Sequence, residues 1–332
     1  MATRWGIVSA GRISKDFTTA LAIRGRDEHE VVAVAARKRE DAERFVGELD
    51  LPHARVYGSY EDLCRDSNVE VVYVGSINTV HFEVSKMALD HGKAVICEKP
   101  LGLNLGQTKE IIQQAREKQL FLMEAMWSRC NPVYRKLAEE IRAGAIGEVM
   151  HSYGSSGAPI SYPGSRVREK ELGGSAVLDI GIYPIQASLL CMGDEKPTAI
   201  MATGHTNDLN VDEVIACNLQ FKNGRSATLD MNSTLLLPNE FYVAGTKGII
   251  KLSSPIWGSS RMESPNGVYE VPKVPGDYVF DNAGLLAYEA DEVRRCLCQG
   301  LKESPLVPHS LTLLMADIME EIRNQIGAET YY

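Results

Sequence analysis

The stretch WGIVSAGRIS, residues 5–14, joins a short apolar run to a turn of small residues. An apolar strand that passes through such a turn into a helix is typical of a dinucleotide-binding unit, whose usual pattern is G-x-G-x-x-G. Only the middle glycine, Gly11, is present, and Ser9 and Ser14 occupy the first and third positions. An ordinary strand-to-helix turn is the alternative, so the surrounding sequence has to decide.

Residues 4–124 continue the rhythm that this turn opens. Short apolar runs that read as buried strands alternate with amphipathic stretches that read as helices, and the runs are RWGIVSA, EVVAVAA, VEVVYVG, KAVICEK and LFLMEA. Strands that are apolar on both sides belong to a parallel sheet with helices on both faces. The sequence therefore predicts an α/β protein whose N-terminal domain, residues 1–124, is a doubly wound parallel sheet of the Rossmann type.

The pattern changes after residue 125. Helical stretches at 131–144 and 174–192 are followed by alternating runs without helices between them, and Asn223-Gly224 is a strong hairpin signal. We expect residues 125–332 to form an α+β domain with a largely antiparallel, open sheet that binds the substrate. An open sheet can pair with its own copy across a two-fold axis, so we also expect dimerisation through this domain.

Composition excludes several classes of partner. The 332 residues carry a net charge of -9, which argues against binding to nucleic acid or to an anionic membrane. No apolar run approaches the roughly 20 residues of a membrane span, and the first residues lack a signal-peptide pattern, so we expect a cytoplasmic protein. The seven cysteines are scattered without zinc-type spacing, and we expect reduced thiols and no metal site.

The first turn and the second strand indicate which cofactor binds. The N-terminus of the helix after Gly11 would offer backbone N–H groups to a phosphate, with Ser9, Arg12 and Ile13 beside it. The second strand ends at Arg37, where enzymes that use NAD commonly place an acid for the ribose 2′-hydroxyl. A guanidinium there suits the 2′-phosphate of NADP, so we expect NADP. A solvated basic loop is the alternative interpretation.

Three further motifs carry a family resemblance. They are SINTVH at residues 76–81, GKAVICEKP at residues 92–100 and GGSAVLDIGIY at residues 173–183. They resemble the T-P-N-x-x-H, E-K-P and D-x-x-x-[HY] motifs of the glucose-fructose oxidoreductase and inositol dehydrogenase family, with Ile77 in place of the usual proline. The resemblance covers nearly the whole chain and implies a cis Lys99–Pro100 bond. It also implies cofactor contacts from Ser76, Asn78, His81, Glu98 and Lys99.

Within this family the closer resemblance is to the dimeric dihydrodiol dehydrogenases. It rests on MEAMWSR at residues 123–129, FDNAG at residues 280–284 and the tyrosine, rather than histidine, at position 183. It implies a homodimeric, NADP-dependent dehydrogenase of trans-dihydrodiols of aromatic hydrocarbons or of aldoses such as D-xylose and D-glucose. It also implies a substrate pocket lined by aromatic side chains, for which core packing is the alternative: Trp127, Trp257 and Phe280.

Three residues have the chemistry that such a reaction needs. Asp179 and Tyr183 are four residues apart on a predicted helix and therefore share one face. The pKa of a free tyrosine is about 10, and a nearby cation such as Lys99 lowers it. We expect Tyr183 to take the proton of the hydroxyl being oxidised, Lys99 to be its electrostatic partner and to contact the nicotinamide ribose, and Asp179 to bind substrate. A core tyrosine and a capping aspartate are the alternatives.

Two other functions are compatible with the same motifs. One is the reverse chemistry, the NADPH-dependent reduction of a sugar-derived carbonyl such as anhydrofructose. The other is a non-catalytic protein that binds the cofactor without turnover, which Lys99, Asp179 and Tyr183 disfavour. Residues 151–170 do not follow the dihydrodiol dehydrogenases, so the sequence leaves the substrate preference open.

Overall fold

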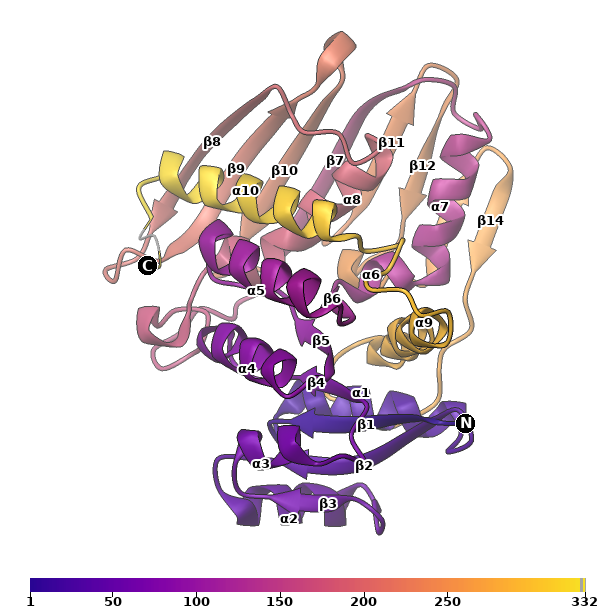
Figure 1. Ribbon diagram of the computed structural model, residues 1–332. Coiled ribbons are helices and arrows are strands. Elements are labelled where there is room, and N and C mark those ends of the chain that lie inside the picture. Colours follow the sequence, from indigo (N-terminus) through magenta and orange to yellow (C-terminus); the bar gives the residue numbers. More distant parts are fainter. Residues whose placement is uncertain (329–330, 332) are drawn as a thin grey trace. The chain divides into compact units, whose positions relative to one another are not determined.

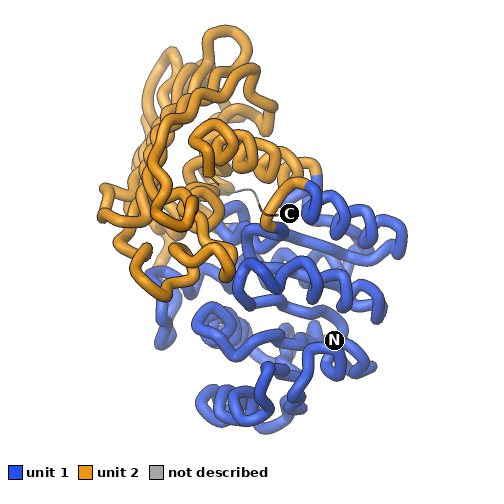
Figure 2. Tube along the Cα trace, turned by 90° about the vertical axis from the view of Figure 1, so that its left-hand side faces the viewer, with its two compact units in different colours: residues 1–102, 106–130, 273–309 blue, residues 103–105, 131–272, 310–332 orange. Residues whose placement is uncertain are grey.

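The computed structural model describes residues 1–328 and 331, and the chain divides into two compact units (Figure 2). The first unit contains residues 1–102, 106–130 and 273–309. The second contains residues 103–105, 131–272 and the described residues from 310 onward. The chain therefore returns to its first unit after it has built the sheet of the second.

A six-stranded parallel sheet forms the centre of the first unit (Figure 1). Its order is β3-β2-β1-β4-β5-β6, and every neighbouring pair is parallel. The predicted doubly wound sheet is confirmed, and its order reverses between β1 and β4, where such sheets bind their ligands. The strands are β1 Thr3–Val8, β2 His29–Ala35, β3 Arg55–Tyr57, β4 Val71–Val74, β5 Ala94–Glu98 and β6 Leu122–Ala125.

Helices join and cover these strands. The α3 helix begins after Ser59, whose hydroxyl accepts a hydrogen bond from the N–H of Asp62, as an N-cap does. The α9 helix comes late in the chain and packs against α1 and α6. The helices are α1 Arg12–Arg24, α2 Arg39–Glu48, α3 Tyr60–Arg65, α4 Asn78–Asp90, α5 Leu105–Lys118, α6 Trp127–Cys130 and α9 Leu286–Cys298.

An eight-stranded sheet forms the second unit, in the order β14-β13-β12-β11-β7-β10-β9-β8. The β7 and β10 strands are parallel and the other pairs are antiparallel, which confirms the largely antiparallel sheet. Asn223 and Gly224, with φ of 61° and 72°, turn β9 back into β10. The strands are β7 Val149–Gly157, β8 Ala199–Thr206, β9 Asp212–Gln220, β10 Ser226–Asn232, β11 Phe241–Gly245, β12 Gly248–Leu252, β13 Arg261–Ser264 and β14 Gly267–Glu270.

One face of this sheet is covered by helix. The α8 helix, Ile182–Cys191, packs closely because small residues face it: a Cβ at Gly154 would lie 2.8 Å from Cβ of Pro184. A π-helical segment, Val177–Gly181, leads directly into α8. The unit also contains α7 Pro132–Arg142 and most of α10 His309–Gln325.

The helical stretch Lys170–Cys191 is long and apolar enough to cross a membrane, but 94% of its most apolar window is buried inside the protein. Burial of this kind is what a core helix needs, because a helix that is apolar on all sides must be surrounded by other protein or by lipid. The stretch is therefore explained by its place against the sheet.

Candidate functional site

The turn between β1 and α1 has the geometry that a cofactor phosphate needs. Ser9 has a φ of 79°, in the left-handed region that favours glycine, which explains why glycine is usual at this position. Gly11 is the N-cap of α1, and no side chain of the described residues caps this helix. The first backbone N–H groups of α1, which begins with Arg12 and Ile13, therefore fit a phosphate.

Ser14, at the third position of the pattern, packs α1 against the end of β4. It is fully buried, and its Oγ donates a hydrogen bond to the carbonyl oxygen of Gly75 at 3.3 Å. A Cβ at Gly75 would clash with Ser14 Oγ and lie 2.6 Å from Cε1 of Tyr73. A glycine on the strand side thus replaces the missing glycine on the helix side, and the close contact is kept.

Arg37 follows β2 and its side chain is exposed. It forms no hydrogen bond or ion pair with any residue that the structure describes, whereas the nearby Arg39 pairs with Glu43 at 2.9 Å. The pKa of Tyr60 is raised by burial, and the positive charge of Arg37 partly opposes this rise. The guanidinium of Arg37 therefore lies near this tyrosine. A guanidinium that follows the second strand, and that has no ion-pair partner among the described residues, fits the 2′-phosphate of NADP.

His81 joins the loops that follow β4 and β5. Its ring is fully buried, with Nδ1 2.7 Å from the carbonyl oxygen of Pro100 and Nε2 3.1 Å from that of Ser76. The Lys99–Pro100 bond is cis, as the resemblance implies. Asn78, the first residue of α4, is also buried. His81 therefore ties the loop that carries Ser76 to the one that carries Lys99.

Glu98, the last residue of β5, and Lys99, which follows it, have different surroundings. Glu98 is buried, and its Oε1 accepts a hydrogen bond from the hydroxyl of Tyr73 at 2.7 Å. Burial, together with the charge of Glu98, raises the pKa of Tyr73 well above its usual value, so Tyr73 stays neutral and donates. Lys99 is only half-buried. Glu98 thus anchors the strand end that presents Lys99.

Two of the predicted aromatic residues belong to the first unit. Trp127 begins α6 and is 7% exposed. Phe280 is 39% exposed, and the centre of its ring lies 4.9 Å from the guanidinium carbon of Arg12. Because Arg12 is the first residue of α1, Phe280 lies at the turn that fits the cofactor phosphate.

Asp179, Tyr183 and Trp257 all belong to the second unit. Asp179 lies in the π-helical segment and Tyr183 in the first turn of α8, and both are buried. The ring centres of Tyr183 and Trp257 are 6.1 Å apart. The predicted helix is present but not regular at Asp179, and π-helical segments occur frequently at functional sites.

Arg166 is a member of this group that the sequence did not indicate. Its Nη1 donates a hydrogen bond to Oδ1 of the buried Asp179 at 2.7 Å. A cation beside a carboxylate stabilises its ionised form. Arg166 lies within residues 151–170, where no motif could mark it, because its partner is set by the course of a loop.

Two other carboxyl groups, both in the first unit, were also missed. Asp16 on α1 accepts hydrogen bonds from the N–H groups of Val279 and Phe280. Glu289 on α9 is fully buried, and neither of its oxygens has a hydrogen-bond partner within the described ranges 1–328 and 331. Both depend on segments that are distant in the sequence, so no local pattern reveals them.

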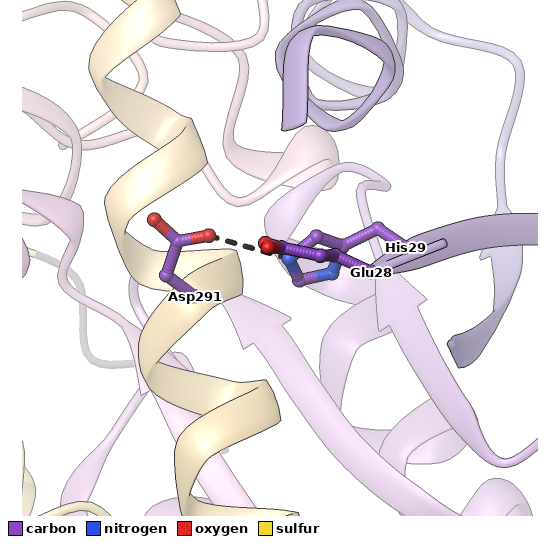
Figure 3. Close-up of side chains that lie close together, drawn as sticks. All are labelled: Glu28, His29 and Asp291. Atoms are coloured by element: carbon purple, nitrogen blue, oxygen red, sulfur yellow. Dashed lines mark hydrogen bonds and ion pairs between the residues drawn. The ribbon is translucent and has the colours of Figure 1, made fainter. Parts of the chain in front are cut away.

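Glu28, His29 and Asp291 place three potential metal ligands within 4.8 Å of one another (Figure 3). The indole N–H of Trp5 donates to Nδ1 of His29 at 3.1 Å, which leaves the proton of the neutral ring on Nε2, 3.3 Å from Oδ1 of Asp291. Asp291 also pairs with Arg24 at 2.8 Å. A metal ion would need the Nε2 lone pair and would lie beside a guanidinium, so the arrangement fits a structural hydrogen-bond chain.

Comparison with known proteins identifies the family. Residues 3–126 match an oxidoreductase family with an NAD-binding Rossmann fold, and residues 134–251 match the Gfo/Idh/MocA C-terminal domain. The chain belongs to the Gfo/Idh/MocA family. It is 42% identical over 329 residues to trans-1,2-dihydrobenzene-1,2-diol dehydrogenase of Xenopus laevis, and the aligned residues cover 98% of this chain and 99% of that protein. The Homo sapiens protein of the same name is 40% identical, with 98% of each chain covered.

Solved structures share the fold. A levoglucosan dehydrogenase in complex with NADH and levoglucosan has a TM-score of 0.84 at 19% identity, covering 98% of this chain and 97% of the other. A 3-ketoreductase from Actinomadura kijaniata, in complex with NADP and TDP-benzene, has a TM-score of 0.81 at 24% identity, with 98% of both chains covered. This chain is therefore an NAD(P)-dependent oxidoreductase of a small-molecule substrate. Because the two neighbours hold different dinucleotides, the fold alone does not select one.

Proposed function

We propose that this protein is an NADP-dependent dehydrogenase that moves hydride between the nicotinamide and a hydroxyl carbon of an aldose or of an aromatic trans-dihydrodiol. The observation that carries the proposal is 42% identity, over 98% of the chain, to a trans-1,2-dihydrobenzene-1,2-diol dehydrogenase. Lys99, Asp179 and Tyr183, which the chemistry needs, are all present in the chain.

The choice of NADP rests on Arg37. Its exposed guanidinium forms no ion pair among the residues described, and it follows the strand that usually ends in an acid where NAD is used. A guanidinium offers a planar fork of N–H groups to a phosphate. Gly11 and the first turn of α1 would hold the pyrophosphate, and Ser76, Asn78 and Lys99 would contact the nicotinamide end. The bound nicotinamide supplies the hydride acceptor.

Tyr183 is the proposed acid–base residue. As hydride leaves the substrate carbon, the phenolate oxygen takes the proton of the hydroxyl on the same carbon, so that a carbonyl forms. A phenolate needs positive charge in its surroundings, and we assign this role to Lys99. Asp179, held by Arg166 at 2.7 Å, accepts a hydrogen bond from the substrate and orients it.

Aromatic side chains are proposed to contact the substrate. Trp257 lies beside Tyr183, and an aromatic ring packs equally well on a dihydrodiol ring or on the apolar face of a sugar. Trp127 is assigned the same role. Phe280 is assigned it as well, although the ring also contacts the guanidinium of Arg12 at the start of α1. Stacking on an aromatic side chain is not specific for one ring. We therefore expect the enzyme to accept both dihydrodiols and sugars.

The second domain, residues 125–332, is proposed to bind substrate and to form a homodimer through the face of its sheet away from α8. Ser152 and Gly154 of β7 face α8, so Tyr153 points to the opposite face, where its ring stacks on that of Tyr242 at 5.5 Å. Both rings are half-buried in the single chain. A two-fold axis across this face would bury them against their own copies.

A substrate panel tests the proposed function. D-xylose, D-glucose and a trans-benzene dihydrodiol are each incubated with the protein and with NADP or NAD, and formation of the reduced nicotinamide is followed. We expect turnover of at least one of these substrates, with NADP preferred over NAD. Cofactor binding without turnover of any of them, in either direction, would contradict a dehydrogenase.

A further inference from the structure

Asp16 on α1 holds a segment that comes from far along the chain. The side chain is fully buried; Oδ1 accepts a hydrogen bond from the N–H of Val279 at 2.7 Å, and Oδ2 accepts one from the N–H of Phe280 at 2.9 Å. Residues 277–280 are called the strap below. Each carboxylate oxygen takes one backbone N–H, so the strap is held in one position, and charge-assisted bonds of this kind are about twice as strong as neutral ones.

The strap has few other anchors. Val279 is 36% and Phe280 39% exposed, so little apolar burial holds them. Lys15 lies 3.9 Å from Asp277, but the side chain of Asp277 is 99% exposed, and exposed pairs contribute little. Tyr278 is half-buried, and its hydroxyl donates a hydrogen bond to the carbonyl oxygen of Pro275, in the same segment, at 2.9 Å. The carboxylate of Asp16 is therefore the main polar link between the strap and α1.

The strap contacts α1 beside the turn that fits the cofactor phosphate. The ring of Phe280 lies 4.9 Å from the guanidinium carbon of Arg12, the first residue of α1. Arg12 and Asp16 are four residues apart and share one face of the helix, so the same face contacts the strap twice. An aromatic ring over a guanidinium is a favourable cation–π arrangement.

The charge of Asp16 needs an explanation. A carboxylate in the first turns of a helix works against binding of an anionic phosphate at the N-terminus of that helix. Burial raises the pKa of Asp16, and the N–H groups of Val279 and Phe280 oppose this effect. A buried carboxylate at this place is accounted for if its task is to hold the strap.

We propose that Asp16 is a positioning residue that, through the strap, keeps Phe280 over the first turn of α1 and thereby slows the release of a bound dinucleotide. The inference rests on the proposed use of this turn for the cofactor phosphates. The dissociation rate of the cofactor then depends on Asp16, whose carboxylate contacts the strap.

The test is a double-mutant cycle on the dissociation rate of NADPH, measured by stopped-flow fluorescence with the full-length protein. Asp16→Asn weakens the charge-assisted hydrogen bonds to the strap, and Phe280→Ala removes the ring over Arg12. Each variant is expected to speed NADPH release about tenfold. The double variant should release NADPH no faster than the faster single variant, because Asp16 acts through Phe280. Asp291→Asn, which removes a carboxylate that pairs with Arg24 at the other end of α1, is the matched control and should leave the rate unchanged.

The outcomes separate this inference from the cofactor assignment. Unchanged NADPH release in Asp16→Asn, or additive effects in the double variant, would overturn the strap while leaving the cofactor site in place. If Asp16→Asn fails to fold, the partly exposed Phe280→Ala still decides, because an unchanged rate there overturns the inference. A wild-type protein that binds neither NADPH nor NADH would overturn the cofactor assignment, and the inference with it.

Discussion

Ser9 and Gly75 show how the turn that opens the fold tolerates its missing glycines. Ser9 adopts a φ of 79°, which costs a residue with a side chain about 1 kcal/mol relative to glycine. Ser14 would crowd the strand opposite, but Gly75 leaves room for its hydroxyl. The turn therefore keeps the backbone shape of a phosphate-binding loop with a different distribution of small residues.

Arg37 is the residue on which cofactor choice depends. Replacing it with aspartate removes the proposed phosphate contact and adds a repulsive charge, so Arg37→Asp should raise the Kd for NADPH by about one to two decades. The Kd for NADH should change far less. Fluorescence titration of both dinucleotides measures the two values.

Lys38→Asp is the control, because it makes the same change of charge one residue further along. It should weaken NADPH binding much less than Arg37→Asp does. Equal effects of the two variants, or an unchanged preference in Arg37→Asp, would show that Arg37 is only a solvated side chain.

The sequence indicated these residues for a physical reason. Gly11, Arg37 and Lys99 each follow an apolar strand, and the strand ends of a parallel sheet gather at one edge. Asp16 and Arg166 could not be found in this way, because their partners lie 263 and 13 residues away along the chain and are reached through loops. Loop courses leave no periodic pattern in a sequence.

On the scale of elements, α9 carries two buried carboxyl groups in opposite electrostatic states. Glu289 is fully buried without a hydrogen-bond partner in the described structure; burial, and then the charge of Glu98, raise its pKa well above the usual value. Burial would also raise the pKa of Glu292, but hydrogen bonds from Arg295 and Ser304 outweigh it, and the pKa is lowered. One helix thus holds a protonated and an ionised glutamate.

These states predict opposite dependences of stability on pH. The folded protein keeps the proton of Glu289 where the unfolded chain has lost it, so this group lowers stability as the pH rises above the unfolded pKa, near 4.5. Glu289→Gln should leave the melting temperature unchanged near pH 4.5 and raise it at pH 8. Each unit of pKa difference corresponds to about 1.4 kcal/mol.

Glu292→Gln, on the same helix, is the comparison. Its lowered pKa stabilises the folded protein above the unfolded pKa, and this contribution is lost as the pH falls through the folded value. The variant should therefore lose roughly 1–3 kcal/mol at neutral pH. Calorimetric melts at both pH values measure the changes, and a Glu289→Gln protein less stable at pH 8 than wild type would contradict a protonated Glu289.

The sequence predicts whether a segment is helix or strand where the pattern of apolar residues runs long enough. It does not reveal short elements or local irregularities within a helix. The strands β4 and β5 are continuous buried runs, and the hairpin at Asn223-Gly224 has its own signal. The three residues of β3 are too few for any period. The π-helical segment at Asp179 has the apolar pattern of the α-helix that it joins, so only the structure distinguishes the two.

At the scale of the whole molecule, residues 273–309 return to the first unit after the second sheet is complete. This return brings both α9 and the strap to α1. Neither the composition nor the order of apolar and polar residues predicts that the chain returns. The change of pattern after residue 125 precedes the second sheet, whose first strand in the chain, β7, begins at Val149. The sequence gives no sign of where the chain leaves that sheet.

The proposed interface, on the face of the second sheet away from α8, predicts that the protein is a homodimer. Light scattering should give twice the 36.5 kDa of one chain for the wild-type protein. Tyr242→Asp places a charge in the proposed two-fold interface and should yield single chains, because an unpaired charge buried at an interface is costly. Tyr162→Asp, the same change at an exposed tyrosine in a loop, should remain dimeric. A wild-type mass of one chain over a wide range of concentration would contradict the dimer.

The acid–base role of Tyr183 is tested most directly by the rate of hydride transfer in Tyr183→Phe, measured as NADP reduction with the best substrate of the panel. The variant keeps the ring that packs beside Trp257 and removes only the group that takes the proton. We predict that kcat falls by roughly 10²–10⁴ while the melting temperature and the Kd for NADPH stay close to those of the wild type. A Tyr183→Phe protein with near-normal kcat would contradict an acid–base role for Tyr183. So would one that no longer binds NADPH, since Tyr183 would then be structural.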